Sequence, residues 1–150
     1  MTEQQRLVAY TRGEAAPSSA LLIEIRQVSD PAACLAKLVT IMQGVLAVPD
    51  ELWHEDAAEQ WEAYLPNWFV TSIKQFSLTQ IMATPGQWDY ESWVATMCDR
   101  QWKWWSSAVG PASLSITLDL LGLPYNGGTF FYAIKASCPV GYTVQATENF

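Results

Sequence analysis

The only histidine of the chain stands among six acidic side chains in the stretch PDELWHEDAAEQWEAYLPNWF, residues 49–69. Paired carboxylates beside a histidine could do acid–base chemistry if they were buried. We expect these acids to face water instead, so the stretch favours binding over catalysis. The candidate binding residues are Glu51, Glu55, Asp56, Glu59 and Glu62, with His54 as a possible secondary contact.

The other reactive groups are three cysteines, Cys34, Cys98 and Cys138. They are odd in number, far apart and outside any CxxC pattern, which is typical of reduced, buried thiols rather than of a disulfide framework. No cysteine or serine has the neighbourhood of a known nucleophile with His54 as its base. A metal site needs several convergent ligands, and the sequence has no second histidine and no HExxH motif. We therefore expect no metal and no catalytic residue.

Phosphate-binding loops are also missing from the sequence. YNGGT at 125–129 has neither the GxGxxG nor the GxxxxGK[ST] spacing, and it lies between two expected strands rather than before a helix. It is predicted to be a turn. We expect no cofactor.

Length and composition indicate one well-packed domain, residues 1–150, because 50% of the residues are apolar and only 15% are charged. The formal net charge of −7 disfavours nucleic acid and anionic membranes and favours a positively charged partner. The start, MTEQQRLVAYTRG, lacks the pattern of an export signal, and no apolar run is long enough for a membrane span. We expect a cytoplasmic protein.

Strands are expected near both ends of the chain. SSALLIEIRQV at 18–28 and SLSITLDL at 113–120 alternate apolar with polar residues, which predicts one dry face and one wet face. RLVAY at 6–10 is a shorter possible strand, joined to the first through a turn at 13–19. TFFYAIKAS at 129–137 and GYTVQAT from Gly141 are expected to be further strands.

Helices are expected in the middle. Asp30 and Pro31 begin one that runs to about Val45, with a buried face formed by Leu35, Leu38, Val39, Met42 and Leu46. The acidic stretch is a second helix, NWFVTSIKQF a third, and Ser77 with Gln80 has the spacing of a capping box. Asp89 caps a last helix through Ser106. The expected fold is α+β, a largely antiparallel sheet of N- and C-terminal strands covered by a central group of helices.

On a helix, the acidic stretch would carry two opposite stripes. Successive residues advance by about 100°. An aromatic stripe of Trp53, Trp61, Tyr64 and Trp68 would then face the core, and the glutamates would face solvent. No Lys or Arg lies from Leu38 to Ile73, so like charges repel at i, i+4 spacing without local compensation. A single-sign surface of this kind attracts an oppositely charged partner.

In these features the chain resembles the small acidic immunity proteins that bacteria make against secreted or contact-dependent toxins. The resemblance is carried by the acidic DELWHEDAAEQWE in one α+β domain, with no catalytic motif and no export signal. It implies binding to a cognate toxin domain, often a nuclease with a basic cleft, either plugging the active site or blocking it from beside. On this hypothesis the protein is not an enzyme, and its partner is a basic protein.

Three other functions stay open. A small-ligand or carbohydrate-binding domain would use exposed tryptophans among Trp53, Trp61, Trp68, Trp88, Trp102, Trp104 and Trp105. In QWKWWSS, at 101–107, Trp102 is expected at the edge of the apolar arc and so could be exposed, which makes it a possible secondary contact like His54. An adaptor or chaperone would use a sheet edge. The third alternative is an enzyme of unfamiliar type.

Overall fold

The computed structural model describes residues 1–9 and 15–150. Its helices are α1 (Glu3–Val8), α2 (Pro31–Ala47), α3 (Ala58–Trp61), α4 (Asn67–Lys74), α5 (Leu78–Ala83), α6 (Tyr90–Cys98) and α7 (Gly128–Ser137), with 3₁₀ turns η1 (Asp50–Leu52) and η2 (Glu55–Ala57). Its strands are β1 (Ala20–Arg26), β2 (Trp102–Val109), β3 (Ser113–Leu120) and β4 (Thr143–Asn149). The protein is α+β, as the sequence predicts.

Within the described residues, the strands form one antiparallel sheet in the order β2–β3–β1–β4. The sequence alternation in β1 and β3 becomes an inner row and an outer row of side chains. The inner row is buried and consists of Leu21, Ile23, Ile25, Leu114, Ile116, Leu118 and Leu120. The strands predicted at 18–28, at 113–120 and from Gly141 are therefore confirmed.

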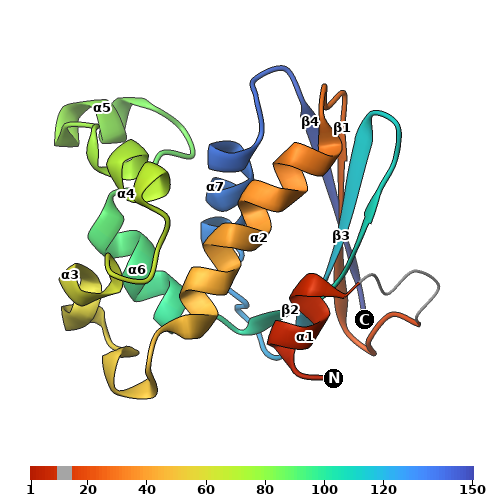
Figure 1. Cartoon of the computed structure of the whole chain (residues 1–150), viewed down its shortest axis with the longest axis horizontal. Coiled ribbons are helices and arrows are strands. Elements are labelled where there is room, and N and C mark those ends of the chain that lie inside the picture. The colour runs from red at the N-terminus through yellow and green to blue at the C-terminus, as the bar shows by residue number, and fades with distance from the viewer. Residues whose placement is uncertain (10–14) are drawn as a thin grey trace.

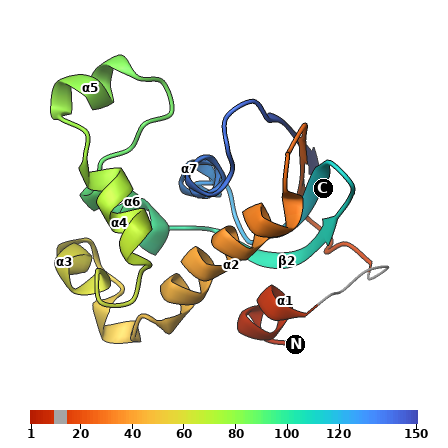
Figure 2. The same ribbon diagram turned by 45° about the horizontal axis from the view of Figure 1, so that its top comes forward.

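Helices α2 and α7 lie against the inner face of the sheet, and α1 lies beside β2 (Figures 1 and 2). The Asp30 carboxylate caps α2 by accepting from the Ala33 N–H at 3.1 Å, as its place before proline predicts. Leu38 and Met42 of α2 are buried as expected. The buried face of α2 is rotated relative to the predicted one. Cys34, Ile41 and Val45 are buried, while Leu35, Val39 and Leu46 are only partly buried.

The prediction of a strand at 6–10 is wrong for residues 6–9, the part of it that the structure describes. Residues 3–8 form α1, because Thr2 and Gln5 make a capping box in which each side chain accepts from the other residue's backbone N–H. Tyr10 and the first part of the predicted turn at 13–19 lie outside the described residues.

The segment TFFYAIKAS was predicted as a strand and is helix α7. Its buried side chains include Phe130, Ala133, Ile134 and Ser137, which follow the three- and four-residue spacing of a helix. The aromatic and β-branched composition favours a strand, but packing against α2 and α6 decides the conformation.

The helix predicted from Asp89 to Ser106 ends early. The Asp89 side chain caps it through the Ser92 N–H at 3.1 Å, as expected, but α6 stops at Cys98. Residues 102–109 form β2, in which Trp102 and Trp104 are buried and Lys103 is exposed. This two-residue period in QWKWW indicates a strand.

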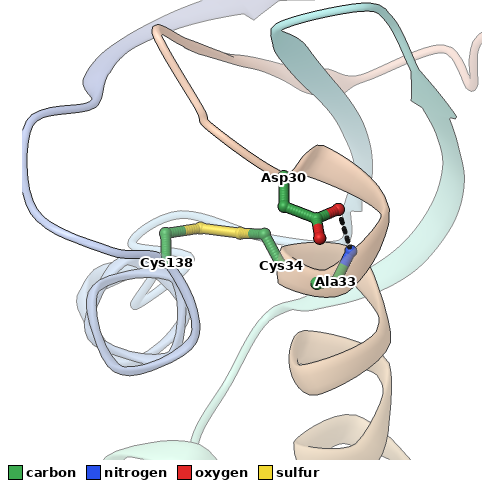
Figure 3. The surroundings of a disulfide bond; sticks show 4 residues. All are labelled: Asp30, Ala33, Cys34 and Cys138. Carbon is green, nitrogen blue, oxygen red and sulfur yellow. Dashed lines mark hydrogen bonds between the residues drawn. A yellow bond between two sulfur atoms is a disulfide. The ribbon is translucent and has the colours of Figure 1, made fainter.

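A disulfide joins Cys34, in the first turn of α2, to Cys138, at the C-terminal end of α7 (Figure 3). The Cα atoms are 5.0 Å apart, within the usual range for a disulfide, and both residues are buried. The prediction of three reduced cysteines is therefore wrong, because the fold brings together two residues 104 positions apart. Cys98 is the free cysteine.

Candidate functional site

Acidic charge is concentrated in one part of the chain. Residues 50–91, named here the acidic segment, contain eight of the fifteen acidic residues and one of the eight Lys and Arg residues, which is a formal charge of −7. The remainder has seven acidic and seven basic residues and is formally neutral. In both views the acidic segment, η1 through the start of α6, lies on the side of the molecule away from β1 and β4 (Figures 1 and 2). The whole net charge of the chain therefore sits on one side.

The acidic stretch 49–69 is not the single helix that the sequence predicts. It forms η1, η2 and α3, and α4 begins at Asn67. The chain leaves helical geometry at Trp53 (φ −84°, ψ 64°) and His54 (φ −150°, ψ 159°). The aromatic residues therefore do not line one stripe: Trp61 is buried, Trp53 is partly buried, and Trp68 and Tyr64 are exposed.

Tryptophan side chains hold these short turns together. The Trp61 indole N–H donates to the Leu52 carbonyl at 2.7 Å, and the Trp53 indole N–H donates to the Val48 carbonyl at 3.0 Å. The two rings meet edge to face with their centroids 5.1 Å apart. The Trp61 indole thus satisfies the Leu52 carbonyl, which a continuous helix would have paired internally, and the Trp53 indole satisfies the carbonyl of Val48, the C-cap residue of α2.

The acids nevertheless face solvent, as predicted. Glu51, Glu55, Asp56 and Glu59 are exposed, and so is His54. Glu62 is partly buried and forms an ion pair with Lys74 at 2.9 Å. Four of the five predicted acids are therefore exposed, although by a different backbone path, and the groove described next contains Glu59 and Glu62.

A groove of about 450 Å³ lies between α3, the end of α4, α5 and the start of α6. Its acidic lining is Glu59, Glu62, Asp89 and Glu91, and Lys74 is the basic residue in it. Its apolar and aromatic lining is Ala58, Ile73, Phe76, Ile81 and Tyr90. A groove of this kind offers carboxylates to a cationic head group and apolar surface to the aliphatic stem that carries it.

Lys74 shows how a cation sits in this groove. Its Nζ is 2.9 Å from the Glu62 carboxylate and 5.1 Å from the centre of the Tyr90 ring, so it uses both a carboxylate and an aromatic face. The Tyr90 hydroxyl donates to the Ala58 carbonyl at 2.6 Å. Burial, and secondly the Glu62 charge, raise the pKa of Tyr90 far above its ordinary value, so the phenol stays protonated at neutral pH.

Apolar side chains are exposed beside the groove. Ile81 of α5 lines the groove, while Leu78 and Met82 are 72% and 81% exposed. Leu78 and Met82 are four positions apart on α5, so they lie on one face of the helix. The capping box predicted for Ser77 and Gln80 is confirmed and starts this helix. A partner in the groove would meet both acidic and apolar side chains, and the exposed residues of α5 extend the apolar surface.

Trp102 is not a surface contact. It was expected at the edge of the apolar arc, but its exposed fraction is 0%, its indole donates to the Asn126 carbonyl at 3.2 Å, and its ring packs on Phe130. Trp61, Trp93 and Trp104 are buried as well. Trp68 is 38% exposed, and Lys37 lies over its ring. The tryptophans serve mainly as core residues.

Cys98 is the free cysteine, and its surroundings disfavour the thiolate form. Burial, and secondly the neighbouring Asp99 charge, raise the pKa of the Cys98 thiol to about 11, so it is protonated and weakly nucleophilic at neutral pH. Within the described residues, no three His, Cys, Asp or Glu side chains are grouped so that they could hold a metal ion. Every helix in the described part of the chain is too short or too polar to cross a bilayer.

Sequence reasoning missed part of the groove, namely Asp89, Glu91, Lys74 and the apolar face of α5. The charges could have been found by extending the count of charged residues from Ile73 to Glu91, because Lys74 is the only basic residue there. The contribution of α5 could not have been found in this way, because it depends on how α5 packs beside α4 and α6. Comparison of the chain with protein-family models, with curated proteins and with solved structures finds no match.

Proposed function

We propose that this protein binds and inhibits a basic protein through the groove and exposed acids of its acidic segment. The observation that carries the proposal is the charge distribution: residues 50–91 hold the entire net charge of −7, and the rest of the chain is neutral. A charge confined to one side orients an approaching basic surface and raises the rate of productive encounter. A charge spread evenly would give solubility without this orientation.

The groove supplies what exposed charge alone lacks. Ion pairs between exposed side chains contribute at most about 1 kcal/mol each, so affinity needs apolar burial as well. The apolar lining of the groove provides it beside Glu59 and Glu91, and the exposed Leu78 and Met82 lie on α5, the helix that contributes Ile81 to the groove. We infer that a lysine or arginine of the partner enters the groove near Glu59 while an apolar residue of the partner covers α5.

Within this function, an immunity protein that neutralises a cognate bacterial toxin domain remains the specific proposal. Support comes from the resemblance to small acidic immunity proteins and from the one-sided charge. A nuclease-like toxin with a basic substrate cleft would be complementary to the acidic segment, which would compete with the anionic substrate for that cleft. The inhibitor itself would have no catalytic role.

The redox state of the cysteines indicates the compartment in which the protein would meet its partner. The cytoplasmic location expected from the sequence remains a proposal, and the disulfide counts against it, because disulfides persist in oxidising compartments and are rare in the cytosol. Alkylation of the protein taken directly from its host, followed by mass measurement, separates the cases. One free thiol indicates an oxidising compartment, and three indicate the cytoplasm.

The test measures association with the basic protein that immobilised wild-type chain retains from its host at low salt. We expect stopped-flow association to slow by about tenfold or more for Glu55→Lys/Glu59→Lys, and the salt dependence to flatten. The matched controls are the single variants Glu59→Lys and Glu24→Lys, which change the net charge equally in the acidic segment and on the sheet. Equal effects of these two variants would contradict the proposal.

A further inference from the structure

The two edge strands of the sheet, β2 and β4, differ in how their outer backbone groups are covered, and β2 is the edge that is protected from pairing with another strand. The Trp104 N–H at this edge donates to the Glu3 carboxylate at 2.8 Å, and the Trp102 carbonyl accepts from the Arg100 guanidinium at 3.1 Å. The register of β2 against β3 also shifts between Trp104 and Ser106. Side-chain pairing and such irregularities keep another strand from adding to an edge.

Strand β4, with the sequence TVQATEN, is the unprotected edge. All seven of its residues are exposed, and it pairs with β1 without a break from Ala20–Asn149 to Arg26–Thr143. It has no proline and no lysine, and Glu148 is its one charged residue. Among the described residues, no side chain hydrogen bonds to the backbone at the outer side of β4. These are the properties that other proteins avoid at a free edge.

The hydrogen bonds of the sheet show which backbone groups of β4 are free. The Leu120 N–H donates to the Ser19 carbonyl at 2.9 Å, so by alternation Leu21, Ile23 and Ile25 bond to β3, and Ala20, Leu22, Glu24 and Arg26 face β4. Their partners in β4 are Thr143, Gln145, Thr147 and Asn149. The N–H and C=O groups of Val144, Ala146 and Glu148 therefore point away from the sheet.

We propose that a second copy of this chain pairs with β4, antiparallel, about a twofold axis at Ala146. In this register Ala146 faces Ala146 of the second copy, so the outward N–H and C=O groups of Val144, Ala146 and Glu148 all find partners. Val144 faces Glu148 of the second copy, and Gln145 faces Thr147. No like charges oppose each other, so the strand is complementary to itself.

The charge distribution favours the same occupant. A second copy carries a net charge of −7, but that charge lies in residues 50–91; the charges in the rest of the chain sum to zero, and β4 contributes one of them, Glu148. The acidic segment lies on the side of the molecule away from β4 in both views (Figures 1 and 2). Pairing through β4 therefore joins the neutral parts, separates the acidic segments, and leaves both free to bind a basic partner.

The test uses sedimentation equilibrium of the full chain, in which we expect the wild type to dimerise. Val144→Glu places a carboxylate opposite Glu148 on both sides of the axis and should weaken dimerisation about tenfold. Val144→Lys should strengthen it, and Val144→Glu/Glu148→Lys should restore it. The control Ser107→Glu, on the other edge strand, should leave it unchanged. Circular dichroism checks that each variant is folded.

Should Val144→Glu fail to fold, Ala146→Pro replaces it. Proline removes only an outward N–H at this position, so pairing of β4 with β1 persists while dimerisation is lost. Two results would overturn the proposal. One is a wild-type chain that stays monomeric at its highest soluble concentration. The other is equal weakening by Val144→Glu and Val144→Lys, because only the self-paired register makes their effects opposite.

Discussion

The sheet with α1, α2 and α7 differs from the acidic segment in what holds it together. In the sheet region, strands pair over seven residues, a disulfide joins α2 to α7, and an ion pair whose side chains are largely buried joins Glu3 to Arg100. In the acidic segment, short turns are held by indole hydrogen bonds and ring contacts. Its one ion pair, between Glu62 and Lys74, lies near the surface.

This difference shows where charge can be changed without harm to the fold. A buried ion pair is costly to break, because the remaining charge is left without a partner in a poorly solvated site. An exposed acid contributes little to stability. The acids of the acidic segment are therefore free to serve a partner, whereas Glu3 and Arg100 serve the fold.

The largest expected effect comes from breaking the largely buried ion pair between Glu3 and Arg100. The Glu3 carboxylate accepts from both Arg100 terminal nitrogens, at 2.7 and 2.8 Å, and from the Trp104 N–H, and the two side chains are 10% exposed. We expect Glu3→Gln to lower the free energy of unfolding by about 3 kcal/mol or more in urea denaturation. The control is Glu24→Gln, which breaks an exposed pair with Arg26 and should leave the free energy of unfolding nearly unchanged. Equal effects would show that α1 does not anchor β2.

The next effect comes from removing the disulfide. Cys34 and Cys138 close a loop with a sequence separation of 104, so a large part of the unfolded chain is constrained. We expect Cys34→Ala/Cys138→Ala to lower the free energy of unfolding by about 2–4 kcal/mol. A reductant should destabilise the wild type and Cys98→Ala alike, and should leave the double variant unchanged. If reductant has no effect on the wild type, the Cys34–Cys138 disulfide does not contribute to stability.

Sequence reasoning succeeded where local signals and tertiary packing agree. The alternation in β1 and β3 was sufficient, because both strands bury one whole face. The N-caps at Asp30, Ser77 and Asp89 could also be predicted from the sequence. A capping side chain accepts a hydrogen bond from the first turn of its own helix, so no distant residue is involved. The acids were expected to face solvent, and Glu51, Glu55, Asp56 and Glu59 do.

Sequence reasoning failed where contacts between distant parts of the chain determine the conformation. Segment 129–137 has a strand-like composition, yet packing makes it α7. Trp53 and His54 fit a helical pattern, yet the indole bonds of Trp53 and Trp61 favour separate turns. The disulfide requires knowledge that α2 and α7 are neighbours, which spacing alone cannot supply. The groove could not be predicted for the same reason, because its lining comes from four short elements.

The smallest of the three effects concerns the contact between the two regions, at Gly44 of α2. A Cβ added here would lie 2.5 Å from the Tyr64 carbonyl oxygen and 3.2 Å from the Leu65 Cα, so α2 and the end of the acidic stretch touch through backbone. We expect Gly44→Ala to lower the free energy of unfolding by about 1–3 kcal/mol, because overpacking outweighs the gain of about 1 kcal/mol in helix propensity.

The measurement for Gly44→Ala is urea denaturation followed by tryptophan fluorescence, because Trp61 lies three residues before Tyr64 and its indole bonds to Leu52. Gln43→Ala, at the exposed neighbouring position of α2, is the control and should change stability by under about 0.5 kcal/mol. A gain in stability for Gly44→Ala would mean that the backbone at residues 64–65 moves away from α2 without loss. The two regions would then be joined loosely, and the acidic segment could adjust its position when a basic partner binds.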